Sequence, residues 1–160
     1  MKRGLHPPIS WFVALSFVLA SCTTDDGVTR DATLQEQVFA TETAFAETMA
    51  DRDFDAFKRF IAEEAVFFSG DTALRGKNAV ISVWRRYFEG DAAPFSWRPA
   101  SVVVLESGDL AFSTGPVHDA SGNTIATFNS VWRRQADGRW LVVFDKGCST
   151  CQAPAPGADR

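Results

Sequence analysis

The sequence is poor in the residue types that build most metal and redox sites. It holds 3 cysteines, 2 histidines and 1 tyrosine in 160 residues. His6 lies close to the N-terminus, which leaves His118 as the one histidine in the rest of the chain. A closed structural zinc site needs four ligands, and Cys148, Cys151 and His118 supply only three. No phosphate-binding loop or nucleophilic serine motif is present either, so we expect neither a metal nor a cofactor.

The sequence also lacks clusters of positive charge. The formal net charge is −4, and without Lys2 and Arg3 it falls to about −6, from 14 basic and 20 acidic residues. The pairs Arg85–Arg86 and Arg133–Arg134 are the nearest approach to a basic patch. Binding to nucleic acid draws on clustered Lys and Arg that displace counterions. We therefore expect no nucleic-acid partner.

No apolar run is long enough to cross a bilayer comfortably. The longest, residues 9–20, has 12 residues and follows Lys2 and Arg3, which is typical of a signal peptide. It ends in Leu-Ala-Ser-Cys at residues 19–22, which resembles a bacterial lipobox. That resemblance implies cleavage before Cys22 and lipidation of its thiol. The alternative is ordinary secretion with Cys22 as a spare thiol.

The lipobox implies a membrane-attached protein of the bacterial cell envelope that faces the periplasm, because several acyl chains give stable attachment. Thr23 follows the cysteine, where an Asp would be associated with inner-membrane retention, so the resemblance implies the outer membrane. We divide the chain into a signal peptide (1–21), a polar flexible tether (22–32), a folded domain (33–147) and a C-terminal segment (148–160) that holds the C-x-x-C pair and ends in a disordered tail.

Cys148 and Cys151 form a C-x-x-C pair at the end of the predicted domain. In an oxidising compartment, the interpretation that we favour is a local disulfide. A redox-active pair is the alternative, although no βαβ pattern surrounds it.

The aromatic content is high, with 14 Phe and 5 Trp, and it helps to define three predicted helices in the first half of the domain. From residue 34 onward, Leu34, Val38, Phe45 and Met49 share one helical face. We expect the charged residues of that helix to lie elsewhere on its surface: Glu36, Glu42, Glu47 and Asp51. Asp53 caps a second helix that carries Phe54, Phe57, Phe60 and Ile61. A short buried strand (65–68) precedes a third helix at residues 76–88.

The second half of the domain has the sequence pattern of β-strands. Turn signals rich in Gly, Asp, Ser and Asn separate strands predicted at residues 95–105, 110–118, 124–135 and 139–147. Pro99 indicates an edge position or a bulge in the first of them. Helices followed by a four-strand meander predict an α+β fold, in which a curved antiparallel sheet with one extra short strand packs against three helices.

This pattern resembles the nuclear-transport-factor-2-like (NTF2-like) superfamily, and more narrowly its SnoaL-like or DUF4440 branch. The resemblance is carried by LRGKNAV at residues 74–80, SGDLAFSTGPV at 107–117 and SVWRRQADGRWLVVFDKG at 130–147. It covers residues 31–147. It implies a cone with an interior pocket, often in a homodimer, and SnoaL-type cyclases use a pocket Asp with His or Asn nearby. Ketosteroid isomerases share the fold but use a first-helix Tyr, where this chain has Phe45.

The last hairpin supplies the main candidate site residue, Asp145. A three-residue loop with Gly138 in the left-handed conformation pairs Gln135 with Arg139, and counting back then places Asn129 opposite Asp145. We favour this loop over a two-residue turn, which would shift the register by one and exchange the faces. Beside aliphatic carbons, the Asp145 carboxyl would be desolvated and its pKa raised, as a general acid or base requires. The alternative is a solvated position at the rim.

His118 is the second catalytic candidate, because imidazole titrates near neutral pH. A two-residue turn at Ser121–Gly122 would place it on the face of Asn129, whereas a three-residue loop would not, and a solvated surface position is the alternative. The candidate ligand-binding residues are Asn129, Trp84, Tyr87, Trp97 and Phe112. For each aromatic one the alternative is ordinary core packing, and a buried Tyr87 needs a hydrogen-bond partner.

Three functional hypotheses follow. The first, which we favour, is a lipid-anchored binding domain for a small, mainly apolar ligand. The second is an enzyme that transfers a proton on a small carbonyl or polyketide-like substrate, with Asp145 as acid or base. The third is a redox protein that uses Cys148 and Cys151.

Overall fold

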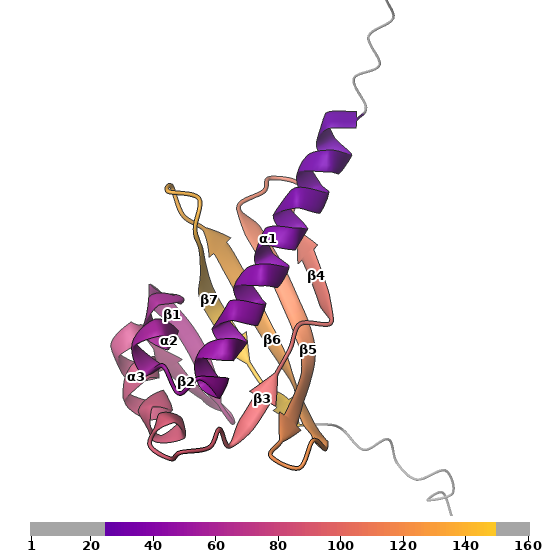
Figure 1. The fold of residues 1–160 in the computed structure, drawn as a ribbon. Coiled ribbons are helices and arrows are strands. Elements are labelled where there is room, and N and C mark those ends of the chain that lie inside the picture. The colour runs from indigo at the N-terminus through magenta and orange to yellow at the C-terminus, as the bar shows by residue number, and fades with distance from the viewer. Residues whose placement is uncertain (1–24, 150–160) are drawn as a thin grey trace, which may run out of the picture.

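The computed structural model describes residues 25–149 as a mixed α+β domain (Figure 1). The helices are α1 (Asp25–Ala50), α2 (Phe54–Arg59), α3 (Lys77–Trp84) and the 3-10 turn η1 (Arg85–Phe88). The strands are β1 (Ile61–Ser69), β2 (Thr72–Arg75), β3 (Phe95–Trp97), β4 (Ser101–Val104), β5 (Leu110–Asp119), β6 (Thr124–Arg134), β7 (Trp140–Lys146) and β8 (Cys148–Ser149). The predicted signal peptide, Cys22 and Cys151 lie outside the described residues.

Helix α1 is longer than the sequence pattern predicts. It begins at Asp25, so residues 25–32, which we expected to belong to the tether, are helical. Its apolar stripe is buried as predicted, with Leu34, Val38, Phe45 and Met49 at most 4% exposed. The described part of the chain holds no helix long and apolar enough to span a membrane.

Helix α2 is capped as predicted but ends earlier. The Asp53 carboxylate accepts a hydrogen bond from the backbone N–H of Ala56 at 2.7 Å. The helix stops at Arg59, Phe60 forms its C-cap, and Ile61 already belongs to β1. Helical spacing therefore placed Ile61 in the wrong element. Periodicity alone cannot find this boundary, because apolar residues continue from the helix into a buried strand.

One curved sheet contains all eight strands, in the order β2-β1-β7-β6-β5-β3, with β4 also paired to β5 and β8 to β6. The meander β5-β6-β7 is antiparallel, and β1 joins it by running parallel to β7. Helix α1 crosses one face of this sheet, while α2 and α3 lie near its β1-β2 end (Figure 1). The predicted fold class is confirmed. Strands β2 and β8 were not predicted, and β8 (Cys148–Ser149) begins at the first cysteine of the C-x-x-C pair, just after the predicted end of the domain.

The predicted strand at residues 95–105 is divided into β3 and β4 around Pro99, in agreement with the expected irregularity. Both pieces pair with β5, which continues without interruption opposite the break. Gly115 lies at this crossing, where an added Cβ would stand 2.0 Å from the backbone oxygen of Arg98. Only a residue without a side chain permits this close approach, which fixes where Trp97 enters the core.

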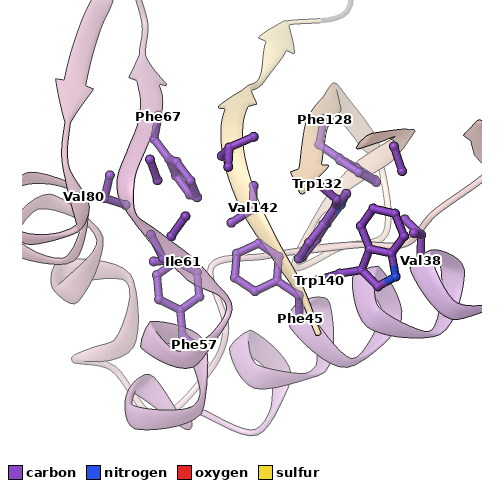
Figure 2. Close-up of a cluster of buried hydrophobic side chains, with 14 of the residues drawn as sticks. Val38, Phe45, Phe57, Ile61, Phe67, Val80, Phe128, Trp132, Trp140 and Val142 are labelled. Atoms are coloured by element: carbon purple, nitrogen blue, oxygen red, sulfur yellow. The ribbon is translucent and has the colours of Figure 1, made fainter. Parts of the chain in front are cut away.

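The core fills the space between α1, α2 and the inner face of the sheet (Figure 2). Phe45 is at its centre: its ring stacks on Phe57 with centroids 5.0 Å apart and meets Trp97 and Trp132 edge to face. Trp132 is fully buried. Such aromatic contacts contribute about 0.5–1.5 kcal/mol each beyond the burial of area. This dense aromatic packing forms the floor of the site described next.

Candidate functional site

A cavity of about 180 Å³ lies on the inner side of the sheet, next to this aromatic cluster. Its walls are mainly apolar and come from α1, α3 and strands β1, β3, β5, β6 and β7. They are Phe45, Phe68, Trp84, Phe95, Trp97, Val117, Ile125, Ala126, Phe128, Asp145 and Gly147. Asp145 is the only ionisable residue among them. The cavity thus combines an apolar wall with a single carboxyl group.

The loop of the last hairpin has the predicted type. Gln135 donates its N–H to the carbonyl of Arg139 at 2.7 Å, and Gly138 has φ +86°. The three residues between Gln135 and Arg139 therefore form the loop, and the strands start in the predicted register, with Arg133 opposite Leu141.

The register then changes at a β-bulge, which the sequence analysis did not predict. Trp132 pairs with Val142, but Val131 pairs with Phe144, so Val143 is the extra residue. The bulge turns Phe144 outward, where it is 50% exposed, whereas the regular register predicted from the loop would place it on the face of Trp132. Bulges commonly re-aim side chains near functional sites.

Because of this bulge, the predicted pairing of Asp145 with Asn129 is wrong. Asp145 lies opposite Ser130, whose hydroxyl donates a hydrogen bond to the carboxylate at 2.9 Å. The carboxyl group is enclosed by the cavity wall, and this desolvation raises the pKa of Asp145 to about 7. The Ser130 hydrogen bond lowers this pKa, and the negative charge of Glu42 raises it. A carboxyl of this kind exchanges its proton near neutral pH.

Glu42, on α1, is the residue that sequence reasoning missed. It is fully buried, although we expected it on the exposed surface of the helix. Its Oε1 accepts a hydrogen bond from the Trp97 indole N–H at 2.8 Å, and its Oε2 accepts from the Ser113 hydroxyl at 2.6 Å and the Trp132 indole N–H at 2.9 Å. Ser130 also lowers the pKa of Glu42 by hydrogen bonding, with a smaller effect than these three donors. Burial raises the pKa of Glu42, and these hydrogen bonds oppose that rise.

A signal for Glu42 was present in the sequence. Positions 38, 42, 45 and 49 follow the i, i+4, i+7, i+11 spacing of one helical face, so Glu42 falls inside the apolar stripe of α1. A carboxylate at such a position needs buried hydrogen-bond donors. Indole N–H groups are donors only, which makes Trp97 and Trp132 suitable partners.

Of the predicted ligand-binding residues, Trp84 and Trp97 line the cavity, whereas Phe112 and Asn129 do not. Phe112 is 41% exposed on the opposite face of the sheet. Asn129 lies on that outer face too, where its side-chain N–H donates to the backbone carbonyl of Lys146 at 3.1 Å. Side chains alternate between faces along a strand, and Phe128 and Ser130 take the inward positions beside Asn129.

His118 lies near the end of β5, opposite Ser96, and is partly exposed. The turn that follows has three residues, with Gly122 at φ +85°, but a bulge at Ile125 shifts the register between β5 and β6. Val117, its neighbour, faces the cavity, so His118 projects to the outer face and is not brought together with Asp145.

Tyr87, in η1, is partly buried beside the cavity rather than on its wall. Its ring meets Trp84 and Phe95 edge to face, and its hydroxyl accepts a hydrogen bond from the Arg86 guanidinium at 2.7 Å. The expected partner of the phenol is therefore a neighbouring arginine.

Two further observations concern metals and cysteines. Among the described side chains of residues 33–149, no group of three or more His, Cys, Asp and Glu is placed to hold a metal ion. Cys148 is exposed in β8, and Cys151 lies outside the described residues, so the disulfide and the redox pair both stay predictions.

The profile of the SnoaL-like domain matches residues 38–145. No curated protein is similar enough to count as a match.

Solved structures agree on the fold. An NTF2-like protein with a cystatin-like fold from Novosphingobium aromaticivorans has a TM-score of 0.61 at 17% identity and covers 86% of this chain and 96% of its own. A ketosteroid isomerase-like protein from Erwinia carotovora atroseptica has a TM-score of 0.56 at 20% identity, covering 72% and 95%. An NTF2-like protein from Pseudomonas putida has a TM-score of 0.58 at 20% identity, covering 75% and 86%.

At these identities the structural neighbours establish the fold alone, and the DUF4440 assignment stays a prediction. The family profile spans more than half of the sequence and runs from α1 to Asp145. The chain therefore belongs to the SnoaL-like domain family, on an NTF2-like fold.

Proposed function

We propose that the cavity beside Asp145 binds a small, mainly apolar molecule that carries one polar group. The observation that supports this function is the pairing of an aromatic wall with a single enclosed carboxyl. A dry apolar cavity of about 150 Å³ is enough to hold benzene, and this one measures about 180 Å³. A single substituted ring is therefore the expected size of ligand, with its polar group directed at Asp145.

The test uses p-cresol and toluene, which are both single rings and differ by the hydroxyl group. Calorimetry should detect binding of both to the purified protein, with p-cresol tighter. Ala126→Leu fills the cavity and should weaken the binding of p-cresol at least about tenfold, which corresponds to 1.4 kcal/mol. Ala136→Leu, in the exposed hairpin loop, is the control and should bind normally. Equal affinity in both variants would show that the probe binds elsewhere.

A second function, acid–base catalysis, is favoured by one specific observation. Asp145 is in contact with the cavity and has a pKa of about 7, which suits a group that takes and returns a proton at neutral pH. The relevant reaction would be proton transfer at a carbon next to a carbonyl. Deuterium uptake by cyclohexanone in D2O measures it directly. Asp145→Asn should abolish the protein-dependent rate, and an unchanged rate would exclude this role.

We also propose that a second copy of the chain covers the outer face of the sheet. Val103, Phe112, Val131 and Phe144 pair in register across four strands and form a continuous apolar row there. Three of them are between 41% and 55% exposed. An apolar row in the middle of a sheet face is typical of an interface, and the same surface on both copies gives a closed two-fold dimer.

Finally, we propose that the chain is anchored to a bacterial envelope membrane through Cys22 and faces the periplasm, at the outer membrane. The support is the order of Lys2 and Arg3, the apolar run at residues 9–20 and the cysteine that follows it. Under this proposal the cavity would meet ligands in the periplasm.

A further inference from the structure

Two buried carboxyl groups, on different elements, approach the same serine. Ser130 on β6 is fully buried and donates to Asp145 at 2.9 Å. It also lowers the pKa of Glu42, on α1, although less than the hydrogen bonds from Ser113, Trp97 and Trp132 do. A serine hydroxyl has a single hydrogen, so Ser130 can serve only one of the two carboxylates at a time.

The two carboxyl groups differ sharply in the donors around them. Glu42 accepts three hydrogen bonds, two from indole N–H groups that can only donate. Asp145 accepts one side-chain hydrogen bond, from Ser130, and its other surroundings are apolar cavity walls. Donors stabilise the ionised form of a carboxyl, whereas apolar walls favour the neutral form. The negative charge is therefore better placed on Glu42.

We propose that Glu42, Ser130 and Asp145 form one proton-holding unit, in which Glu42 is a positioning residue that stays ionised and Asp145 carries the exchangeable proton facing the cavity. When Asp145 is ionised, Ser130 donates to it, as in this structure. When Asp145 gains its proton, that proton points into the cavity, and the Ser130 hydroxyl, which the neutral carboxyl no longer needs as a donor, turns toward Glu42. One proton enters or leaves, and no covalent bond between heavy atoms changes.

Among the described residues, Asp145 is the only ionisable side chain that lines the cavity. Of the described charged groups, Glu42 is the one whose charge changes the pKa of Asp145. His118, on the neighbouring strand, projects to the other face of the sheet. The negative charge of Glu42 raises the pKa of Asp145, in agreement with this coupling. Two acids that interact in this way titrate as a pair rather than separately.

The role of this unit in ligand selection rests on the ligand site proposed above. Its proton equilibrium does not, because it can be measured in the free protein. At pH below the Asp145 midpoint the cavity offers a hydrogen-bond donor. It therefore selects ligands with an acceptor, such as a carbonyl or hydroxyl oxygen. Above that midpoint the cavity wall carries the negative charge of Asp145 and disfavours anionic or purely acceptor ligands.

The experiment is an NMR titration of the full chain, which follows the side-chain carboxyl carbons together with the indole N–H signals. Trp97 and Trp132 report on Glu42, and Trp140, which does not line the cavity, is the internal control. Asp145 should titrate with a midpoint near 7. The Trp97 and Trp132 signals should shift with the same midpoint because Ser130 changes its partner. Glu42→Gln should lower the Asp145 midpoint, because it removes the negative charge that raises the pKa of Asp145.

Ser130→Ala and Ser113→Ala form a matched pair, since these two fully buried serines lie opposite each other on β6 and β5. Ser130→Ala should raise the Asp145 midpoint and uncouple the two indole signals from it. Ser113→Ala removes a Glu42 hydrogen bond that does not reach Asp145, so the coupling should persist.

The proposal is overturned if the Trp97 and Trp132 indole signals of the wild type do not change at the Asp145 midpoint. It is overturned as well if Ser130→Ala and Ser113→Ala have the same effect on that coupling. It is also overturned if Glu42→Gln folds and leaves the midpoint unchanged. Binding of p-cresol is measured separately. If p-cresol fails to bind but the coupling holds, only the proposed ligand site is wrong. If p-cresol binds and the coupling is absent, only this inference is wrong.

Discussion

Ser130 and Asp145 lie directly opposite each other in the sheet, and the serine hydroxyl donates to the carboxylate at 2.9 Å. This pairing depends on one extra residue, Val143, which changes the register of the last hairpin after its first three pairs. Without the bulge, Asn129 would oppose Asp145 and the carboxyl would share the outer face. The position of the candidate site is thus set by a local irregularity of one strand.

Replacing Asp145 by Asn should stabilise the protein at alkaline pH. The folded chain holds the Asp145 proton up to about pH 7, whereas the unfolded chain loses it near the ordinary carboxyl pKa of 3.8. Wild-type stability therefore falls as the pH rises from about 4 to 7 and stays low above it. With allowance for partial exposure, the gain for Asp145→Asn at pH 8 should be about 2–4 kcal/mol in the free energy of unfolding, and little at pH 4.

Urea unfolding at the two pH values measures this difference. Asp137→Asn is the control, because Asp137 is exposed and its pKa is lowered by the Arg139 guanidinium, so that variant should show no gain at pH 8. A variant of Asp145 that is no more stable than wild type at pH 8 would contradict the burial of this carboxyl.

Gly115→Ala should destabilise the fold strongly. The added methyl would stand 2.0 Å from the Arg98 backbone oxygen and 2.9 Å from the Phe128 ring, so the break between β3 and β4 would have to move. We expect a loss of about 3 kcal/mol or more, as for overpacked positions. Gly90→Ala has only an ordinary contact at 3.8 Å and should lose far less. Similar melting temperatures for both variants would refute the close crossing.

Phe144→Glu should convert the proposed dimer to a monomer. It places a charge in the centre of the apolar row on the outer face, where burial of an unpaired carboxylate is unfavourable. Sedimentation velocity of wild type and variant gives the oligomeric state. Phe39→Glu is the control, because Phe39 is similarly exposed, at 45%, but lies on α1. A wild-type protein that is monomeric at all concentrations would exclude this interface.

Cys22→Ala should release the protein from the membrane fraction. Lipidated wild type should incorporate an alkyne-labelled fatty acid in bacteria and partition into detergent, whereas the variant should do neither. Cys148→Ala is the matched control and should behave as wild type. If the Cys22 variant still incorporates label, the lipobox interpretation is wrong.

Sequence patterns predicted those features that depend on local chemistry. The Asp-Gly turn specified the hairpin loop with Gly138, and the apolar stripe of α1 specified which face is buried. The raised pKa of Asp145 was also predicted in direction, from its position on an otherwise apolar strand.

The features that were missed depend on long-range packing. Val142, Val143 and Phe144 are all apolar, so no alternation marks which of them bulges. Glu42 needed donors from β3, β5 and β6, which are between 55 and 90 positions away in sequence. The inward positions of Ser113 and Ser130 likewise follow from the register between strands rather than from their own neighbours.

The central claim is that Asp145 presents an exchangeable proton to a ligand cavity, and one titration tests it most directly. The side-chain carboxyl carbon of Asp145 is followed by NMR from pH 4 to 9, with and without saturating p-cresol. The account predicts a midpoint near 7 in the free protein and a shifted midpoint with p-cresol bound. A midpoint near the ordinary value of 3.8 that p-cresol does not move would contradict it.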